Sequence, residues 1–358
     1  MKIIHFIYDH TGNPWVGGGG AVRVNEIYKR ISKKHSITVV CGQYPNAEDY
    51  TDGNINFHFA GTNKNNYILS TLSYALKAAR FLKGNKNNFD IVIEDFAPYN
   101  PIFSFLQRKN AIVQLHQKEG VRHLKKYGLL GSLFFLIENL YPRLFQNFIT
   151  ISEMSKEKFG LTGNVVIIAN GFDSSLLSVK ISEQNYILYL GRFHINQKGI
   201  DTVSEALKYT KHSLVLAGSG KDELKVREMF REYINSGIVA IVGFVTGAKK
   251  IDFLRNCIFM IMPSRYEGQP LSIIEAAACG KPVIVSDIPE LRYVVDAGFG
   301  ISFKTGDAYD LAEKMKYLHE NEALRREMGN RGREYAKNYT WDTIAAKFEE
   351  FLLKCMKK

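Results

Sequence analysis

Two glutamates eight positions apart are the clearest candidates for chemistry in this sequence. Glu267 and Glu275 stand in PSRYEGQPLSIIEAAACGKPVIVSD, which covers residues 263–287. An apolar run ends at the start of this segment, so Glu267 is expected in a loop and Glu275 on the helix that follows. Carboxylates at the C-terminal edge of a parallel sheet accept paired hydroxyl groups of a sugar or ribose. Glu267 has the chemistry of a nucleophile, whereas Glu275 could simply form a local ion pair.

Two cations flank a glycine-punctuated loop earlier in the chain. Arg192 follows Gly191 directly after an apolar run, and Lys198 precedes Gly199. Arginine can hold phosphate oxygens bidentately, and lysine adds a compact positive charge. Such a pair suits a diphosphate that gains negative charge as it leaves. The alternative is a loop with two solvated cations.

A run of four glycines, Gly17 to Gly20, follows the first apolar segment and precedes a helical pattern. Glycine lets backbone N–H groups approach an anion, and the helix N-terminus favours negative charge. The run is not GxGxxG followed by an acidic residue, which disfavours a dinucleotide site. It also lacks the Lys-Ser/Thr of a P-loop. The alternative is a flexible turn.

One histidine stands where a strand is expected to end. His116 follows Ala111–Leu115, so it should lie at the ligand-binding edge of its sheet. The alternative is a structural histidine with satisfied hydrogen bonds. His5 falls inside the first expected strand and is interpreted as structural, whereas the role of His194, near the cations, stays open.

Elements that alternate between strand and helix must position these residues. The first half shows six short apolar runs with helical patterns between them, and the pattern restarts after residue 185. This alternation predicts an α/β fold with two doubly wound parallel sheets. We expect an N-terminal domain over 1–171, a linker over 172–185, a second domain over 186–340 and a last helix over 341–358.

Composition excludes several classes of protein. The 358 residues are 46% hydrophobic and 23% charged, which is ordinary for a globular chain. Four cysteines without a CxxC pair give no sign of structural zinc or a disulfide framework, and favour a reducing compartment. The first residues do not read as a signal peptide, and the apolar run Leu129–Ile137 is too short to cross a bilayer.

The net charge of +11 is uneven along the chain. Residues 1–165 carry 20 Lys and Arg against 12 Asp and Glu. A basic half predicts an anionic partner, either a lipid surface or a polyanionic substrate, or simply a solubilising surface. A nucleic-acid partner is not expected, because no recognised binding motif accompanies the charge.

Taken together, these motifs resemble the large family of retaining nucleotide-sugar glycosyltransferases with the GT-B fold (group 1, family 4). The resemblance covers nearly the whole chain in order. It includes GGAVRVNEIYKRI, the strand-end histidine, ANGFD, GRFHINQKG, LAGSGKDEL, VGFV, the E-x7-E pair and a terminal YTWD before a helix. The resemblance implies two Rossmann-like domains facing a deep cleft, with the last helix crossing back to the first domain.

The resemblance also implies roles. Arg192 and Lys198 would hold the donor diphosphate, and Glu275 the ribose. Glu267 would contact the transferred sugar, and His116 would assist near the anomeric carbon. The other implied donor-binding positions are Gly19, Gly20, Gly218, Phe244, Gly268, Gln269, Pro270 and Leu271. Asn170 would lie on the acceptor side.

The family usually needs no divalent metal, and this sequence contains no Asp-x-Asp pair. No cofactor is therefore expected. The implied activity is retaining transfer of a hexose-type sugar from a UDP- or GDP-sugar to a glycan or lipid-linked glycan. The expected setting is bacterial cell-surface polysaccharide or glycoconjugate synthesis, in the cytoplasm or at the cytoplasmic membrane face. Alternatives are an epimerase or phosphorylase of the same fold, or a non-catalytic carbohydrate-binding module.

Overall fold

The strand and helix alternation folds into two α/β units in the computed structural model, which describes residues 1–16 and 18–356. One unit comprises Met1–Asn170 with Trp341–Lys358, and the other comprises Gly171–Thr340. The predicted linker, 172–185, lies inside the second unit, where Phe172 N donates to Tyr339 O at 3.0 Å. The predicted fold class is confirmed.

Unit 1 is built on an eight-stranded sheet with the order β3-β4-β2-β1-β5-β6-β7-β8. Neighbouring strands are parallel, except that β3 runs antiparallel to β4. The central strands are buried on both faces, as parallel sheets require. The strands are β1 (Lys2–Phe6), β2 (Ser36–Gly42), β3 (Tyr50–Asp52), β4 (Ile55–Ala60), β5 (Ile91–Asp95), β6 (Ile112–Leu115), β7 (Asn147–Thr150) and β8 (Asn164–Ile167).

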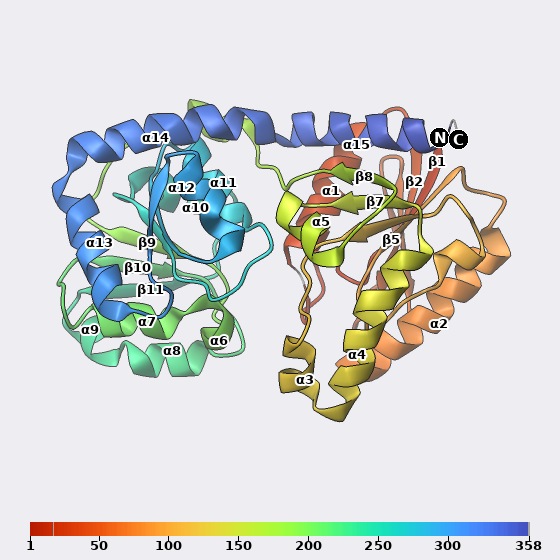
Figure 1. Cartoon of the computed structure of the whole chain (residues 1–358), viewed down its shortest axis with the longest axis horizontal. Coiled ribbons are helices and arrows are strands. Elements are labelled where there is room, and N and C mark those ends of the chain that lie inside the picture. Colours follow the sequence, from red (N-terminus) through yellow and green to blue (C-terminus); the bar gives the residue numbers. More distant parts are fainter. Residues whose placement is uncertain (17, 357–358) are drawn as a thin grey trace. The chain divides into compact units, whose positions relative to one another are not determined.

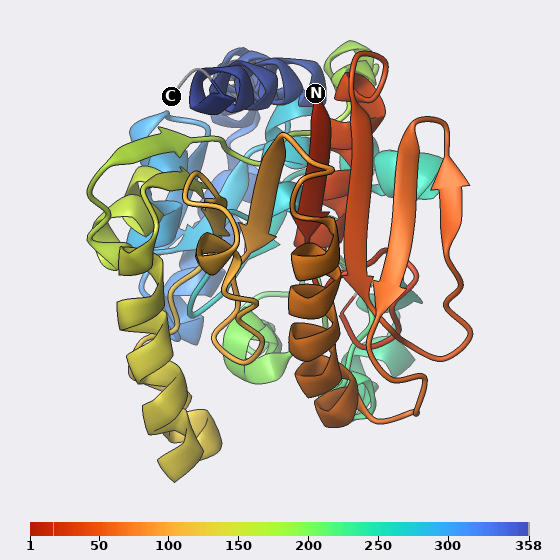
Figure 2. The same cartoon turned by 90° about the vertical axis from the view of Figure 1, so that its right-hand side faces the viewer.

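Helices connect these strands, as Figures 1 and 2 show. They are α1 (Gly19–Ile31), α2 (Tyr67–Asn85), α3 (Arg122–Tyr127), α4 (Leu129–Leu140) and α5 (Glu153–Phe159), with 3-10 turns η1 (Ser104–Leu106) and η2 (Tyr141–Leu144). The last helix, α15 (Trp341–Met356), packs on α1 in the same unit. The rings of Tyr28 and Phe348 meet edge to face at 5.9 Å, and Arg30 Nε lies 2.9 Å from Asp342 Oδ1.

Unit 2 has a six-stranded parallel sheet with the order β11-β10-β9-β12-β13-β14. Its strands are β9 (Ile187–Leu190), β10 (Leu214–Ala217), β11 (Val239–Gly243), β12 (Met260–Met262), β13 (Val283–Ser286) and β14 (Gly300–Phe303). Its 3-10 turns are η3 (Ser174–Ser178), η4 (Pro289–Leu291) and η5 (Lys337–Tyr339). Its helices are α6 (Ile195–Lys198), α7 (Ile200–Ala206), α8 (Glu223–Met229), α9 (Arg231–Asn235), α10 (Gly247–Asn256), α11 (Leu271–Ala278), α12 (Arg292–Asp296), α13 (Ala308–Glu320) and α14 (Glu322–Ala336).

The four cysteines are buried thiols, and none is in a disulfide. Burial raises the pKa of Cys257 and of Cys279 to about 12. Their role in this structure is packing.

Candidate functional site

In unit 2, the strand order marks the carboxyl ends of β9 and β12 as the place where a ligand would bind. The chain passes from β9 outward through β10 to β11, then returns to β12 on the other side of β9. Open parallel sheets bind ligands outside the carboxyl ends of the strands at such a reversal. The loops after β9 and β12 meet here, and they carry the two predicted motifs.

The β9 loop touches the β12 loop through its backbone. Gly199 has φ +61°, and a Cβ there would lie 2.0 Å from the carbonyl oxygen of Pro263, so only glycine fits. Arg265 N also donates to Gln197 O at 2.8 Å. The side chain of Arg265 reaches back to Asp201, with Nη2 2.6 Å from Oδ2. These contacts hold Lys198, at the end of α6, against the end of β12.

Lys198 and Glu267, 69 positions apart, form a buried ion pair. Lys198 Nζ lies 2.5 Å from Glu267 Oε1, and Ser264 Oγ donates to the same oxygen at 2.6 Å. Lys198 is 8% exposed and Glu267 is 5% exposed. The sequence predicted both residues for the site, and the structure brings them into direct contact.

The second carboxylate also has a cationic partner. Glu275 lies on α11, largely buried, and its Oε1 is 2.5 Å from Lys250 Nζ on α10. Lys250 was not among the sequence-predicted residues. The helix starts at Leu271, and its N-cap residue, Pro270, makes no side-chain cap. The first N–H groups of α11 have no partner within the helix, and a helix N-terminus of this kind favours an anion.

Four further predicted positions follow strands at the same sheet edge. Gly218 follows β10, and a Cβ there would meet the carbonyl oxygen of Gly191 at 1.9 Å, so the β9 and β10 loops are in backbone contact. Phe244 follows β11 and is 74% exposed. Gly268 and Gln269 follow Glu267 in the β12 loop.

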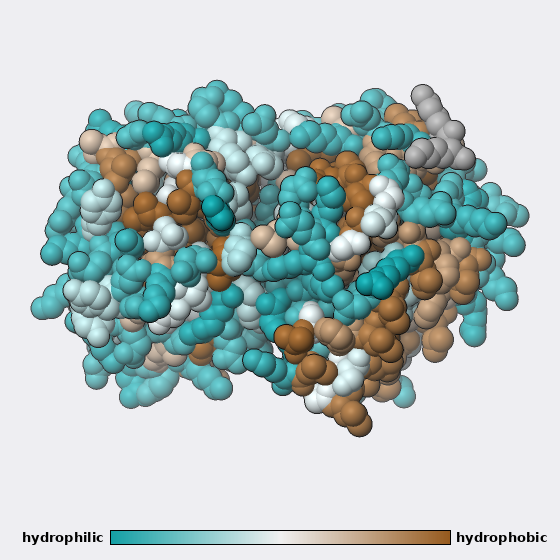
Figure 3. All heavy atoms as spheres, in the orientation of Figure 1, coloured by the Kyte–Doolittle hydropathy of each residue, from teal (hydrophilic) through white to brown (hydrophobic). Residues whose placement is uncertain are grey.

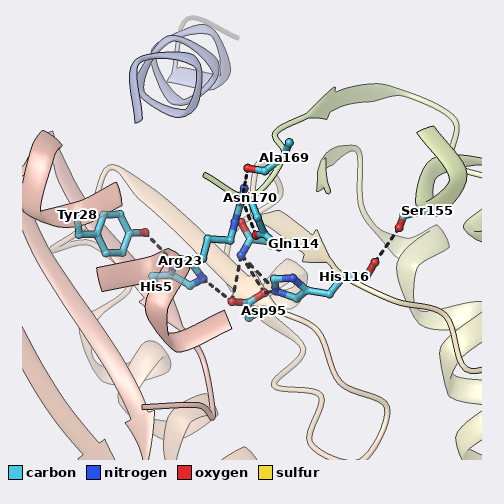
Figure 4. Close-up of polar contacts among 9 residues, drawn as sticks. All are labelled: His5, Arg23, Tyr28, Asp95, Gln114, His116, Ser155, Ala169 and Asn170. Atoms are coloured by element: carbon cyan, nitrogen blue, oxygen red, sulfur yellow. Dashed lines mark hydrogen bonds and ion pairs between the residues drawn. The ribbon is translucent and has the colours of Figure 1, made fainter. Parts of the chain in front are cut away.

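In unit 1, His116 belongs to a hydrogen-bonded cluster around Asp95, shown in Figure 4. Asp95 ends β5, and its Oδ1 lies 2.6 Å from His116 Nε2. Gln114 Nε2 donates to both carboxylate oxygens, at 3.0 and 3.1 Å. On the other side, Asp95 Oδ2 lies 3.3 Å from His5 Nε2, and His5 Nδ1 is 2.7 Å from the Tyr28 hydroxyl.

Electrostatics explain why Asp95 stays ionised in this buried place. Burial by itself raises the pKa of the carboxyl group, but the charge of His116 and hydrogen bonds from His116 and His5 outweigh it. The net result is a pKa well below the ordinary range. Asp95 therefore presents a fixed negative charge to the imidazole of His116.

Arg23 of α1 is fully buried beside this cluster. Its Nη1 donates to Ala169 O at 2.5 Å and to Asn170 Oδ1 at 3.3 Å. Burial lowers the pKa of Arg23 to about 10, and the charge of Asp95 opposes that shift. Asn170, predicted for the acceptor side, is itself buried and bound to Arg23.

The glycine run forms the start of α1. Gly19 and Gly20 are its first two residues, and Gly17 lies outside the described residues. A Cβ at Gly20 would lie 3.5 Å from Asp9 Oδ2, an ordinary contact. The carboxylate of Asp9 thus stands beside this helix N-terminus and places negative charge there.

Comparison with known proteins supports one class of enzyme. Residues 178–335 match the family model described as Glycosyl transferases group 1. An uncharacterized glycosyltransferase of Methanocaldococcus jannaschii is 26% identical over 353 residues, covering 96% of each chain. Together these matches support a group 1 glycosyltransferase. The family match falls within unit 2, which carries the Lys198–Glu267 pair.

Other similar proteins extend the picture of this glycosyltransferase. The N,N'-diacetylbacillosaminyl-diphospho-undecaprenol alpha-1,3-N-acetylgalactosaminyltransferase of Campylobacter jejuni is 28% identical over 60% of this chain and 62% of its own. Sucrose-phosphate synthase from Thermosynechococcus elongatus superposes with a TM-score of 0.82 at 19% identity, over 100% and 99% of the two chains. The Anabaena protein HepE, solved with UDP and glucose, gives 0.75 at 18%, over 99% of each. These structures show the GT-B fold.

Sequence reasoning missed Lys250 beside Glu275 in unit 2, and it missed Asp95 and Arg23 in the histidine cluster of unit 1. Asp95 is the last residue of β5, and His116 is the first residue after β6. The position at a strand end, which indicated His116 in the sequence, therefore also applied to Asp95. Lys250 and Arg23 gave no such signal, because their sequence surroundings are those of ordinary helix cations. None of the described helices is both long and apolar enough to cross a membrane.

Proposed function

We propose that this glycosyltransferase moves a hexose-type sugar from a UDP- or GDP-sugar to a glycan or lipid-linked glycan, with retention of configuration. The observation that carries the proposal is the buried Lys198–Glu267 pair at the strand reversal of unit 2. A buried cation beside a carboxylate offers groups for a phosphate and for a sugar hydroxyl at one point. The names of two similar proteins support the classes of donor and acceptor: HepE was solved with UDP and glucose, and the Campylobacter enzyme is named for a diphospho-undecaprenol substrate.

We assign the donor groups in unit 2 as follows. Arg192 and Lys198 neutralise the diphosphate, helped by the backbone N–H groups at the start of α11, from Leu271 onward. Pro270, which has no N–H, leads the chain into this helix. Glu275 accepts hydrogen bonds from the ribose hydroxyls, and Glu267 accepts them from the sugar. Backbone groups at Gly218, Phe244, Gly268 and Gln269 complete the donor-binding set.

In unit 1, we propose that His116 contacts the sugar near its anomeric carbon, held by Asp95. Gly19 and Gly20 offer backbone N–H groups for the diphosphate, although Asp9 weakens the attraction of that helix end for an anion. Arg192 and Lys198 of unit 2 therefore neutralise most of the charge of the diphosphate. Asn170 accepts a hydrogen bond from Arg23, and we propose that this contact fixes the position of Asn170 at the end of unit 1.

The proposed reaction breaks the bond from the anomeric carbon to the diphosphate oxygen and forms a bond to the acceptor oxygen on the same face. The acceptor hydroxyl gives its proton to the leaving phosphate oxygen. Glu267 is a poor nucleophile here, because Lys198 and Ser264 both bind its Oε1. Since Arg192 and Lys198 supply positive charge to the leaving group, we propose that the transfer needs no metal and no cofactor.

The relatives' names support a place in the synthesis of cell-surface glycans. Besides the Campylobacter enzyme, a capsular polysaccharide biosynthesis glycosyltransferase of Staphylococcus aureus is 25% identical over 67% of this chain. We propose that the enzyme works at the cytoplasmic face of the membrane, where it would meet a lipid-linked acceptor.

A thermal-shift screen of UDP-, GDP- and ADP-sugars tests the donor, because at equal ligand concentration the sugar nucleotide that binds the folded protein most tightly raises its Tm most. The stabilising sugar nucleotide is then incubated with lipid-linked or glycan acceptors in EDTA, and NMR reads the anomeric configuration of the product. Transfer with retention in EDTA is expected. An inverted product, a strict metal requirement or turnover of the donor to an epimer without acceptor would overturn the proposal.

A further inference from the structure

Helix α4 of unit 1 turns its leucines outward. Its sequence places leucines at spacings of four, three, four and four residues, which put them on one side of a helix. In a helix that packs on a core this side is buried, but here the exposed fractions run from 49% to 91%. The residues are Leu129, Leu133, Leu136, Leu140 and, just beyond the helix in η2, Leu144. We call them the leucine face.

The inward side of α4 is fixed by specific contacts, so the outward orientation is determined by the fold. A Cβ at Gly131 would lie 2.1 Å from the carbonyl oxygen of His123, so α4 and α3 touch at backbone distance. Glu138 is buried, and it accepts hydrogen bonds from the backbone N–H groups of Glu119 and Gly120 at 2.8 and 2.7 Å. Rotating the helix to bury its leucines would break these contacts and expose the buried polar groups.

Helix α2 repeats the pattern. Its exposed side begins with Ile68, Leu69, Leu72 and Leu76, and cations follow at Lys77, Arg80 and Lys83. Tyr99 packs against the α3–α4 region: its ring meets Phe134 of α4 edge to face at 5.4 Å and Tyr127 of α3 at 6.4 Å. Figure 3 shows hydrophobic surface over the α3–α4 region and over α2 in unit 1.

The charges around this surface are mainly positive. Residues 120–137 contain Arg122, Lys125 and Lys126 and no Asp or Glu. Residues 53–89 contain five Lys and Arg, again with no Asp or Glu. Two carboxylates lie beside these stretches, but Glu138 is buried and Glu119 lies 3.8 Å from His123 Nδ1. A leucine surface bordered mainly by cations is the pattern of a helix that lies in the interface of an anionic membrane. It is a poor pattern for self-association, because two copies would bring their cations together without carboxylates to pair them.

We propose that the leucine face and the exposed side of α2 dock unit 1 on an anionic phospholipid bilayer. Leucines enter the headgroup boundary, and Arg122, Lys125 and the α2 cations bind lipid phosphates. With 12 residues, α4 is too short to span the bilayer and lies along its surface. Docking would bring the enzyme to a lipid-linked acceptor, but the binding itself does not rest on the proposed transfer reaction.

Vesicle flotation of the full chain without substrates tests the proposal, using phosphatidylcholine vesicles with and without phosphatidylglycerol. Binding should require the anionic lipid and weaken with salt. Leu129→Ser with Leu133→Ser should reduce vesicle affinity roughly tenfold for each leucine. Lys125→Glu should reduce it for anionic vesicles. The matched control is Leu224→Ser on α8 of unit 2, a leucine that is 84% exposed, which should bind like the parent chain.

Circular dichroism and the thermal shift given by the sugar nucleotide should be unchanged in every variant, which separates this proposal from the donor assignments. Equal vesicle binding by the leucine variant and the parent chain would overturn it. So would a dimer in analytical ultracentrifugation that the leucine variant abolishes, since a second copy would then cover the face. If the double variant does not fold, Leu136→Gln alone takes its place.

Discussion

The carboxylate of Asp95 lies between two histidines: Oδ1 is 2.6 Å from His116 Nε2, and Oδ2 is 3.3 Å from His5 Nε2. His5 lies on β1, Asp95 ends the neighbouring β5, and His116 directly follows β6, so the pairing of these strands sets the distances. Asp95 holds Nε2 of His116, and the other ring nitrogen, Nδ1, is then the one available to a substrate. Asp95 is thus a positioning residue that acts through His116.

Asp95→Asn should lower kcat on the order of 10- to 100-fold, because an amide keeps the shape but removes the charge that orients the imidazole. The KM for the donor should change little. The decisive measurement is a double-mutant cycle with His116→Ala, in which the Asp95 substitution should have no further effect. Additive losses in the double mutant would show that Asp95 does not act through His116.

Lys198→Ala should reduce both activity and stability. Removing the lysine leaves Glu267 buried without its partner, which costs about 3–5 kcal/mol of folding free energy. A solvated loop cation, the alternative that the sequence left open for Lys198, would lose no stability on the same substitution. Denaturant unfolding followed by circular dichroism measures the loss.

The double variant Lys198→Met with Glu267→Gln separates the two roles of the ion pair. It removes both buried charges, so most of the stability should return. Transfer activity should stay lost, because the diphosphate and the sugar lose their partners. Recovery of activity together with stability would mean that the pair is structural only.

Glu275→Ala should weaken binding of the nucleoside diphosphate by roughly 10- to 100-fold, since a hydrogen bond to a charged group contributes about 1.5–3 kcal/mol. The preference among sugars should not change, because Glu275 is assigned to the ribose. Isothermal titration calorimetry with the free nucleoside diphosphate gives the affinity. Glu313→Ala on α13 is the control, and an equal loss there would refute the assignment.

Gly218→Ala should lower the Tm and the donor affinity together. The new Cβ would lie 1.9 Å from the carbonyl oxygen of Gly191, so the loop that carries Arg192 must move. Gly84→Ala on α2 is the matched control, because a Cβ there meets no heavy atom within 4 Å. Its stability should stay within about 1 kcal/mol of the parent chain. Unchanged donor affinity in Gly218→Ala would show that loop contact to be unimportant.

The sequence by itself determined the fold class and most of the strands, because alternating apolar and amphipathic runs leave few ways to bury two sheets. It missed β3, β8 and β14, which are short or lie late in their units. It also indicated residue types suited to a diphosphate and to sugar hydroxyls, through the local motifs around Lys198 and Glu267.

Only the tertiary structure decided which of these residues meet. The contact of Lys198 with Glu267 follows from β9 and β12 being neighbours, and that of Asp95 with His5 follows from the pairing of β5 with β1. Periodicity showed that α4 has an apolar side but could not show that it faces outward. That orientation depends on Gly131 and Glu138, whose partners lie in the preceding helix and loop. The spacing of residues along the chain determines which side of a helix or which end of a strand they occupy. Contacts between distant segments depend on the order of the strands in each sheet.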